Sequence, residues 1–128
     1  MPLPRALARA NRVGLNRVTL RLAPRLPGFG VVEHRGRRSG RVYRTPVNVF
    51  ATDDGFAIAL TYGAESEWVR NVLAAGKAVV ETRGIRHPVV SPRIVRDPSR
   101  SYVPLPVRVV LGRIDVTDFL LLDAAPAL

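Results

Sequence analysis

Short apolar runs separated by glycine, proline and aspartate make up most of this chain, a pattern typical of β-strands joined by turns. The predicted strands cover residues 31–34, 45–52, 56–61, 78–82, 85–90 and 91–95. The Asp-Gly pair that ends at Gly55 predicts a hairpin, because these residues tolerate a positive φ. Gly84 predicts a second hairpin, and Pro88 predicts an edge position, because proline cannot donate a ladder hydrogen bond.

One stretch between the strands has helical periodicity instead. Residues 66–75 carry an apolar stripe that includes Trp68 and Val72, with Ser66 as a candidate cap and Gly76 at the end. Two further short helices are expected at residues 107–111 and 116–122. Several short strands around one helix predict an α+β, mainly β fold of the small-barrel or half-open-barrel kind, not a parallel α/β sheet.

Residues 1–27 differ from the rest of the chain in being a basic, amphipathic segment. Apolar positions recur near helical spacing across residues 3–26, with arginines between them. Such a helix either packs on the domain with a solvated charged face or lies on an anionic membrane surface. We therefore expect an N-terminal helical segment followed by a barrel at residues 28–128, within a single globular domain.

The composition of the 128 residues narrows the chemistry. There are no cysteines, so disulfides and thiolate ligands are excluded, and no His, Asp and Glu cluster has the spacing of a metal site. No apolar run is long enough for a membrane span or signal peptide, so a cytoplasmic location is expected. The net charge of +10 predicts an anionic partner, such as a nucleic acid, a membrane surface or a multiply charged cofactor.

Residues 34–46 concentrate this positive charge in a glycine-bearing turn. Its five arginines are Arg35, Arg37, Arg38, Arg41 and Arg44. Guanidinium groups bind phosphate and carboxylate with a planar fork of donors, and glycines let backbone N–H groups approach an anion. A solvated basic loop is the alternative interpretation. A nucleic-acid interface is not expected, because Tyr43 is the only aromatic residue in the turn and no recognition helix is evident.

The chain lacks the usual catalytic motifs. There is no Gly-x-Gly-x-x-Gly, Walker lysine or Gly-x-Ser-x-Gly, and His34 and His87 are interpreted as structural or surface residues. Chemistry would therefore have to come from a bound cofactor. Trp68 is either a core residue or, beside Arg70 and Asn71, part of a site for a flat heterocycle with a polar edge.

Four motifs occur in a recognisable order. They are residues 36–40 (Gly-Arg-Arg-Ser-Gly), 44–47 (Arg-Thr-Pro-Val), 61–63 (Thr-Tyr-Gly) and 68–72 (Trp-Val-Arg-Asn-Val). This ordered set resembles the deazaflavin-dependent nitroreductase family, whose members are also called quinone reductases. The similarity extends over about residues 30–95.

The resemblance implies a split β-barrel that binds coenzyme F420, an 8-hydroxy-5-deazaflavin with a phospholactyl-polyglutamate tail. It assigns the phosphate and tail to Arg37, Arg38, Ser39 and Gly40. It places Tyr43, Arg44 and Thr45 along the cofactor groove, Leu60, Thr61 and Gly63 beside the ring, and Trp68, Arg70 and Asn71 at the closed end of the pocket. Reduced cofactor would then pass a hydride to a small-molecule electron acceptor such as a quinone, nitro compound or enone. Tyr62 is the candidate for orienting the acceptor or donating a proton.

This sequence departs from the family pattern near its C-terminus. Relatives that reduce nitroimidazoles carry several tyrosines there, whereas this chain has only Tyr102, so nitroimidazole reduction is not expected. Three alternatives stay open: FMN as the cofactor, a non-catalytic deazaflavin- or lipid-binding module, and a nucleic-acid-binding barrel. A homodimer is a further expectation, because split barrels commonly dimerise.

Overall fold

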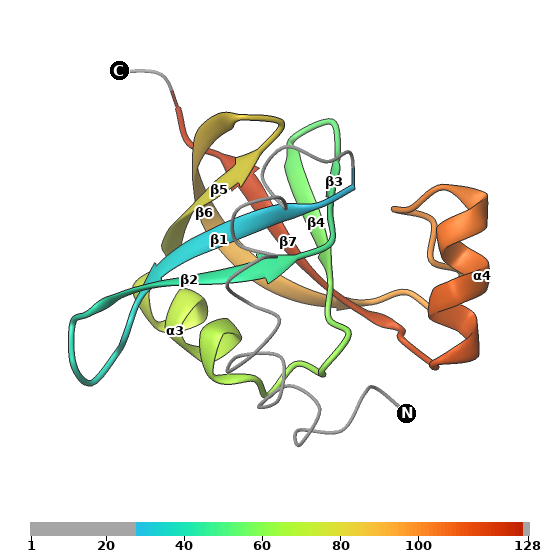
Figure 1. Cartoon of the computed structure of the whole chain (residues 1–128), viewed down its shortest axis with the longest axis horizontal. Helices are drawn as coiled ribbons and strands as arrows, with labels where there is room; N and C mark the ends of the chain where they lie inside the picture. The colour runs from blue at the N-terminus through green and yellow to red at the C-terminus, as the bar shows by residue number, and fades with distance from the viewer. Residues whose placement is uncertain (1–27, 127–128) are drawn as a thin grey trace.

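The computed structural model describes residues 28–126 and shows one curled antiparallel sheet with two helices (Figure 1). The seven strands lie in the order β2-β1-β5-β6-β7-β4-β3. The strands are β1 (Gly30–Arg35), β2 (Val42–Val47), β3 (Val49–Ala51), β4 (Gly55–Ala59), β5 (Lys77–Thr82), β6 (Ile85–Arg96) and β7 (Asp118–Ala124). Helix α3 (Glu67–Ala75) follows β4, and helix α4 (Leu105–Arg113) lies between β6 and β7. The predicted mainly β, half-open barrel is confirmed.

The inside of the curl is the hydrophobic core. Helix α3 packs against β1, β5 and β6 and buries Val69 and Val72 completely. The other members of this cluster are Val32, Val49, Phe56, Ile58, Leu60, Val80, Val89, Leu120 and Leu122. Full burial of one such side chain contributes about 1.5–3 kcal/mol to folding. A second cluster, centred on Phe119, holds Leu111 of α4 against the sheet.

The two predicted hairpins and the end of the central helix are confirmed, although Gly55 does not have the positive φ expected of it and is the first residue of β4. Arg83 and Gly84 both have positive φ (52° and 77°), as a two-residue hairpin requires. Gly76 ends α3 at φ 71°, and its N–H donates to the carbonyl oxygen of Val72 at 2.9 Å. Ser66 precedes α3 as predicted, but its hydroxyl donates to the carbonyl oxygen of Gly63 at 3.1 Å and makes no side-chain cap.

The prediction of a helix at residues 116–122 is wrong. These residues mostly form β7, which pairs with β4 on one side and β6 on the other and buries Phe119, Leu120 and Leu122. A short continuous apolar run fits a buried strand as well as a helix, and here sheet pairing decides. The helix expected at residues 107–111 is present within α4, but it is followed by β7 and is therefore not a terminal helix.

The single strand predicted at residues 45–52 is instead two strands. The chain leaves β2 at Val47, turns at Asn48 and enters β3. Since β2 and β3 are the two edges of the sheet, only one residue connects opposite edges. The sheet must curl to bring them together. The Asn48 side chain supports the turn by donating to the carbonyl oxygen of Gly28 at 3.3 Å.

The edge position predicted for Pro88 is wrong for its strand, because β6 pairs with both β5 and β7. The proline is tolerated because pairing with β7 ends next to it, at Val89 and Ala124. The carbonyl oxygen of Pro88 accepts from the Ala125 N–H at 2.9 Å. The nitrogen of Pro88 lies on the same side of β6, beyond the last residue pair with β7, where the ladder does not need a donor. Residues 91–95 continue β6 past a bulge at Ser91, whose φ is 57°.

Candidate functional site

The arginine-rich turn is a compact loop between β1 and β2. Gly36 N–H donates to the carbonyl oxygen of Arg41 at 2.8 Å, and Gly40 N–H donates to that of Gly36 at 2.9 Å. Gly40 has φ 70°, and a Cβ on Gly36 would lie 2.7 Å from the Ser39 hydroxyl oxygen. Gly40 therefore suits the left-handed conformation of this turn, and a side chain at Gly36 would force the Ser39 and Tyr43 side chains to move. Ser39 Oγ accepts from Arg41 N–H at 3.2 Å and lies 3.4 Å from the Tyr43 hydroxyl.

Helix α3 fixes the first arginine of this loop. Asn71 Oδ1 accepts from the Arg37 backbone N–H at 3.2 Å and from the Arg37 guanidinium at 2.8 Å. The same guanidinium forms an ion pair with Glu67 at 2.8 Å. The bond from Arg37 is the largest cause that lowers the pKa of Glu67, and Arg70 and Arg38 lower it further. Three guanidinium groups thus act on one carboxylate, which leaves the loop positive.

A buried histidine completes this network below the loop. Asn71 Nδ2 lies 3.2 Å from His34 Nδ1, and His34 Nε2 lies 3.0 Å from Thr45 Oγ1. His34 is 5% exposed and Asn71 is 7% exposed. Burial lowers the pKa of His34 to about 4, so the imidazole is neutral near pH 7.

Two aromatic rings flank His34. The Tyr43 ring stacks on the imidazole at a centroid distance of 5.8 Å, and the Trp68 ring lies 6.5 Å away at 47°. Trp68 also packs against the core cluster, which confirms its interpretation as a core residue. The structure therefore brings together six of the predicted site residues, namely Arg37, Ser39, Tyr43, Thr45, Trp68 and Asn71.

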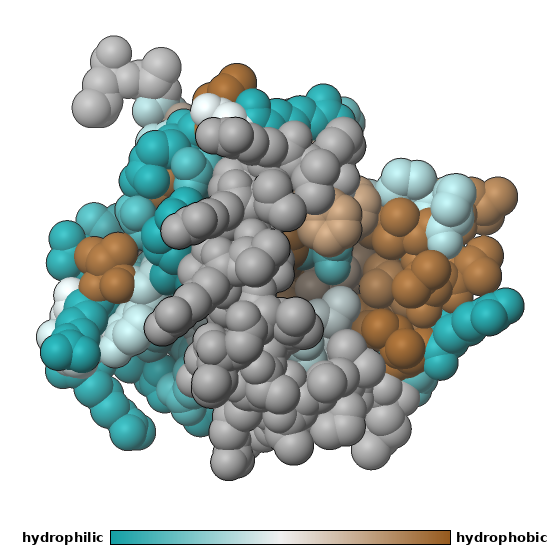
Figure 2. Space-filling view, in the orientation of Figure 1, coloured by the Kyte–Doolittle hydropathy of each residue, from teal (hydrophilic) through white to brown (hydrophobic). Residues whose placement is uncertain are grey.

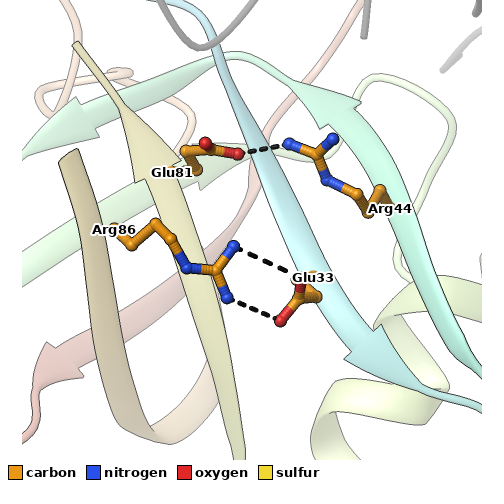
Figure 3. A network of polar contacts seen from close by, with 4 residues as sticks. All are labelled: Glu33, Arg44, Glu81 and Arg86. Atoms are coloured by element: carbon orange, nitrogen blue, oxygen red, sulfur yellow. Dashed lines mark hydrogen bonds and ion pairs between the residues drawn. The ribbon is translucent and has the colours of Figure 1, made fainter. Parts of the chain in front are cut away.

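The structure places Arg44 away from this group. Successive side chains of a strand point to opposite faces, so Arg44 points away from the face that carries Tyr43. It forms an ion pair with Glu81, beside the pair of Arg86 and Glu33 at 2.8 Å (Figure 3). The hydrogen bond from Arg86 is the largest cause that lowers the pKa of Glu33. Arg44 thus belongs to a surface ion-pair network across β2, β1, β5 and β6.

The segment after β4 is held by backbone hydrogen bonds. Leu60 is buried in the core at 2% exposure, and its N–H donates to the carbonyl oxygen of Asp118 at 3.1 Å. Gly63 has φ 91° and donates to the carbonyl oxygen of Leu60 at 3.0 Å. Tyr62 is half-buried between them. Arg38 and Arg70 are exposed, on the loop and on α3 respectively.

An apolar pocket of about 390 Å³ lies between this segment and α4. Its lining residues are Asn48, Thr61, Pro106, Val107, Val110, Leu111 and Ile114. Leu105, Val109 and Val110 of α4 are more than half exposed, and Figure 2 shows an apolar surface on this side of the molecule. Figure 1 places the loop at residues 36–41 and α4 at opposite ends of the molecule.

Sequence reasoning missed two parts of this arrangement. The structural interpretation of His34 is confirmed, but its hydrogen bonds to Asn71 and Thr45 were not predicted, although its alternation with Val32 on an apolar strand indicates an inward side chain. The pocket was missed because its wall is formed by α4. Within residues 28–126, no group of three His, Asp or Glu side chains could hold a metal ion. No helix of the described chain is long and apolar enough to cross a membrane.

Comparison with known proteins now adds to this geometry. The sequence model of the F420H(2)-dependent quinone reductase family matches residues 8–117. The chain belongs to this family. Family members depend on reduced coenzyme F420, so this is the cofactor, and the chain is an F420-dependent oxidoreductase in general terms. A search of curated proteins finds no match.

Two solved structures support the fold. One is a domain-swapped dimer with 13% identity and a TM-score of 0.54, covering 91% of this chain and 98% of its own. The other is HutZ, the heme storage protein from Vibrio cholerae, with 11% identity and a TM-score of 0.52, covering 84% of this chain and 87% of its own. At these identities they establish the split-barrel fold alone.

The residues present fit coenzyme F420. The phosphate and glutamates of its tail are anions, and the loop offers exposed guanidinium groups at Arg38 and Arg41 beside the held Arg37. The neighbouring Tyr43 and Trp68 rings suit the flat, uncharged part of such a cofactor. The family assignment and the donor set therefore agree.

Proposed function

We propose that this protein uses reduced coenzyme F420 to reduce a small, apolar quinone-type acceptor. The observation that carries the proposal is the arginine loop at residues 36–41, held in place from α3 in a chain of an F420H(2)-dependent family. An anion-binding loop that is ordered before binding loses less conformational entropy when the ligand arrives.

The residues proposed to bind the cofactor fall into groups that would contact different parts of it. Arg37, Arg38, Ser39 and Gly40 would hold the phosphate and tail, with Arg70 adding positive charge from α3. Tyr43, Thr45, Trp68 and Asn71 would line the groove next to the loop. Leu60 and Gly63 would contribute backbone beside the ring, since the Leu60 side chain is in the core. Arg44 would act at longer range, because Glu81 already neutralises it.

The apolar pocket beside α4 is our candidate for the acceptor site. Thr61 and Asn48 are its polar residues, and the rest of its lining is apolar. Such a pocket favours an uncharged ring that carries a few hydrogen-bond acceptors, which describes a quinone. Thr61 joins this pocket to the segment that contains Tyr62 and Gly63.

Coenzyme F420, when bound in its reduced form, supplies a hydride from C5. The residues of this chain would hold the donor and the acceptor in register and keep water out, which is how proximity accelerates such a transfer. The reduced acceptor oxygen also needs a proton. Tyr62 would orient the acceptor or donate this proton through its phenol, so Tyr62→Phe should lower turnover and change its pH profile. Unchanged turnover and pH profile in Tyr62→Phe would remove this role.

Two further predictions remain attached to this function. A homodimer is expected. If residues 1–25 form a helix that lies on anionic lipid, the protein should bind anionic vesicles, and a membrane quinone becomes a suitable acceptor. The N-terminal residues 1–27 lie outside the described part of the chain. Vesicle binding that persists after deletion of residues 1–25 would contradict the second prediction.

Titration with oxidised coenzyme F420, followed by its fluorescence, tests the proposal directly. We expect a Kd of about 1 µM or tighter in the wild type and at least about tenfold weaker binding in Arg38→Ala. Arg93→Ala is the matched control, because Arg93 is an exposed arginine of β6 paired with Asp123. Menadione should then be reduced by the wild type in the presence of the reduced cofactor. Absence of binding, or preferential binding of FMN or nucleic acid, would refute the proposal.

A further inference from the structure

In the hydrogen-bond network that holds Arg37, the donor and the acceptor of each bond can be assigned. Asn71 Oδ1 faces two donors, the backbone N–H and the guanidinium of Arg37. The oxygen of the amide must therefore lie on that side, and Nδ2 must point to His34. Because Nδ2 donates, His34 Nδ1 accepts and carries no proton. The proton of the neutral imidazole is then on Nε2 and is donated to Thr45 Oγ1 at 3.0 Å.

This arrangement leaves His34 without a free nitrogen for proton transfer. Both ring nitrogens are used, and the imidazole is buried and flanked by Tyr43 and Trp68. A role as general acid or base is therefore not supported. The imidazole offers an acceptor to Asn71 Nδ2, so that the amide is hydrogen-bonded at both ends in the orientation that the two Arg37 donors set.

That orientation reaches the anion-binding loop. When the Asn71 amide oxygen faces Arg37, this one oxygen accepts hydrogen bonds from both the backbone N–H and the guanidinium of Arg37. If the amide were reversed, its NH₂ would face the two Arg37 donors, and both bonds to Arg37 would be lost. His34 thus supports, through its bond to Asn71 Nδ2, the side chain that holds the loop's first arginine.

We propose that His34 is a positioning residue that presets Arg37, through Asn71, to receive the anionic part of coenzyme F420. This inference rests on the proposed function, because it takes the loop at residues 36–41 as the site of the phosphate and tail. It goes further in assigning affinity for the charged end of the cofactor to a buried, uncharged side chain that does not touch it.

Three variants distinguish a positioning role of His34 from a role in packing alone. His34→Phe keeps a ring between Tyr43 and Trp68 but removes both hydrogen bonds, and the smaller His34→Leu removes the same bonds if phenylalanine is too large. His34→Gln can restore an acceptor for Asn71 and a donor for Thr45. Each variant is titrated with coenzyme F420 and with the deazaflavin riboside that lacks the phosphate and glutamates. Hydrogen exchange of the Arg37 amide is measured in parallel.

We expect His34→Phe or His34→Leu to weaken coenzyme F420 binding about tenfold, with riboside affinity within about twofold of the wild type. The Arg37 amide should exchange faster in these variants, and His34→Gln should restore both properties. Equal weakening for the two ligands, or unchanged affinity in a folded His34→Leu, would overturn the inference. Failure of the wild type to bind coenzyme F420 would instead overturn the proposed function, and unchanged Arg37 exchange in His34→Leu would still contradict the positioning role.

Discussion

Gly55 of β4 lies so close to β7 that a Cβ at this position would overlap the carbonyl oxygen of Leu122. The added Cβ would also lie 2.8 Å from the backbone nitrogen of Ala124. Both neighbours are backbone atoms of a paired strand, so neither can move aside without disturbing the ladder. The junction of β4 and β7 therefore depends on a residue without a side chain.

Gly55→Ala should accordingly destabilise the protein, by about 2 kcal/mol or more. The measurement is urea unfolding followed by circular dichroism. Gly112→Ala is the control, because a Cβ there would have its nearest neighbour at 3.7 Å and alanine favours the helix by up to about 1 kcal/mol. Equal stability of the two variants would contradict the close approach of the two strands.

Acidification should destabilise the protein through His34. Its pKa is about 4 in the folded protein and 6.5 in an unfolded chain, so the unfolded state binds more protons between these values. Stability is then lost as the pH falls from 6.5 towards 4, by an amount on the order of 3 kcal/mol. The check is the difference in unfolding free energy between wild type and His34→Gln across this range. A pH-independent difference would argue against a buried neutral imidazole.

Replacing Asn71 by aspartate should raise the pKa of His34. The new carboxylate would lie beside the imidazole and favour its protonated form. The expected result is an upward shift of the His34 titration, read from the imidazole proton signals in NMR. An unchanged titration would mean that Asn71 does not face His34.

The loop before α4 depends on the carboxylate of Asp97. Its oxygens accept from the backbone N–H groups and the hydroxyls of Ser99 and Ser101, and these bonds lower its pKa to about 2. Asp97→Ala should cost about 1–2 kcal/mol in unfolding free energy. Because the pKa is lowered, this contribution should be present at neutral pH and lost as the pH falls below 4 towards 2. A variant as stable as the wild type would show that the loop does not need this carboxylate.

Filling the pocket beside α4 should weaken the binding of the electron acceptor and leave the binding of coenzyme F420 unchanged. Val107→Phe adds volume at a lining residue and should raise the KM for menadione about tenfold, with coenzyme F420 affinity within about twofold. Val109→Phe is the matched control, because Val109 is on the same helix and exposed but does not line the pocket. Equal effects of the two substitutions would place the acceptor elsewhere.

Much of the fold could be predicted because local signals agreed with the final packing. Gly76, Gly84 and the alternation of β1 are read directly from residue types and spacing. The run at Phe119–Leu122 could not be assigned in this way. Its conformation depends on the open edges of β4 and β6, which come from distant parts of the chain. Asn48 was missed for the same reason, since the curl of the whole sheet determines the break there.

The candidate site, like the fold, could be predicted only in part from local sequence signals. The sequence motifs identified Arg37, Thr45, Trp68 and Asn71, which the structure brings together. His34 was correctly interpreted as structural, but its hydrogen-bond partners could not be predicted, because a single buried histidine has no sequence signal that distinguishes a network member from a core residue. The alternation of Tyr43 and Arg44 already implied opposite faces for these two residues, so the separate placement of Arg44 could have been inferred.

The central place of β7 has a consequence for how the chain acquires its structure. β7 follows every other described strand in the sequence, yet it joins the β3–β4 hairpin to the four strands β2, β1, β5 and β6. Until it has been synthesised, β4 and β6 expose unpaired apolar edges that can pair with other chains. Assembly must also close long loops before these contacts form, which slows folding. Nascent or truncated chains that lack β7 should therefore be the species most prone to aggregate and most dependent on chaperones.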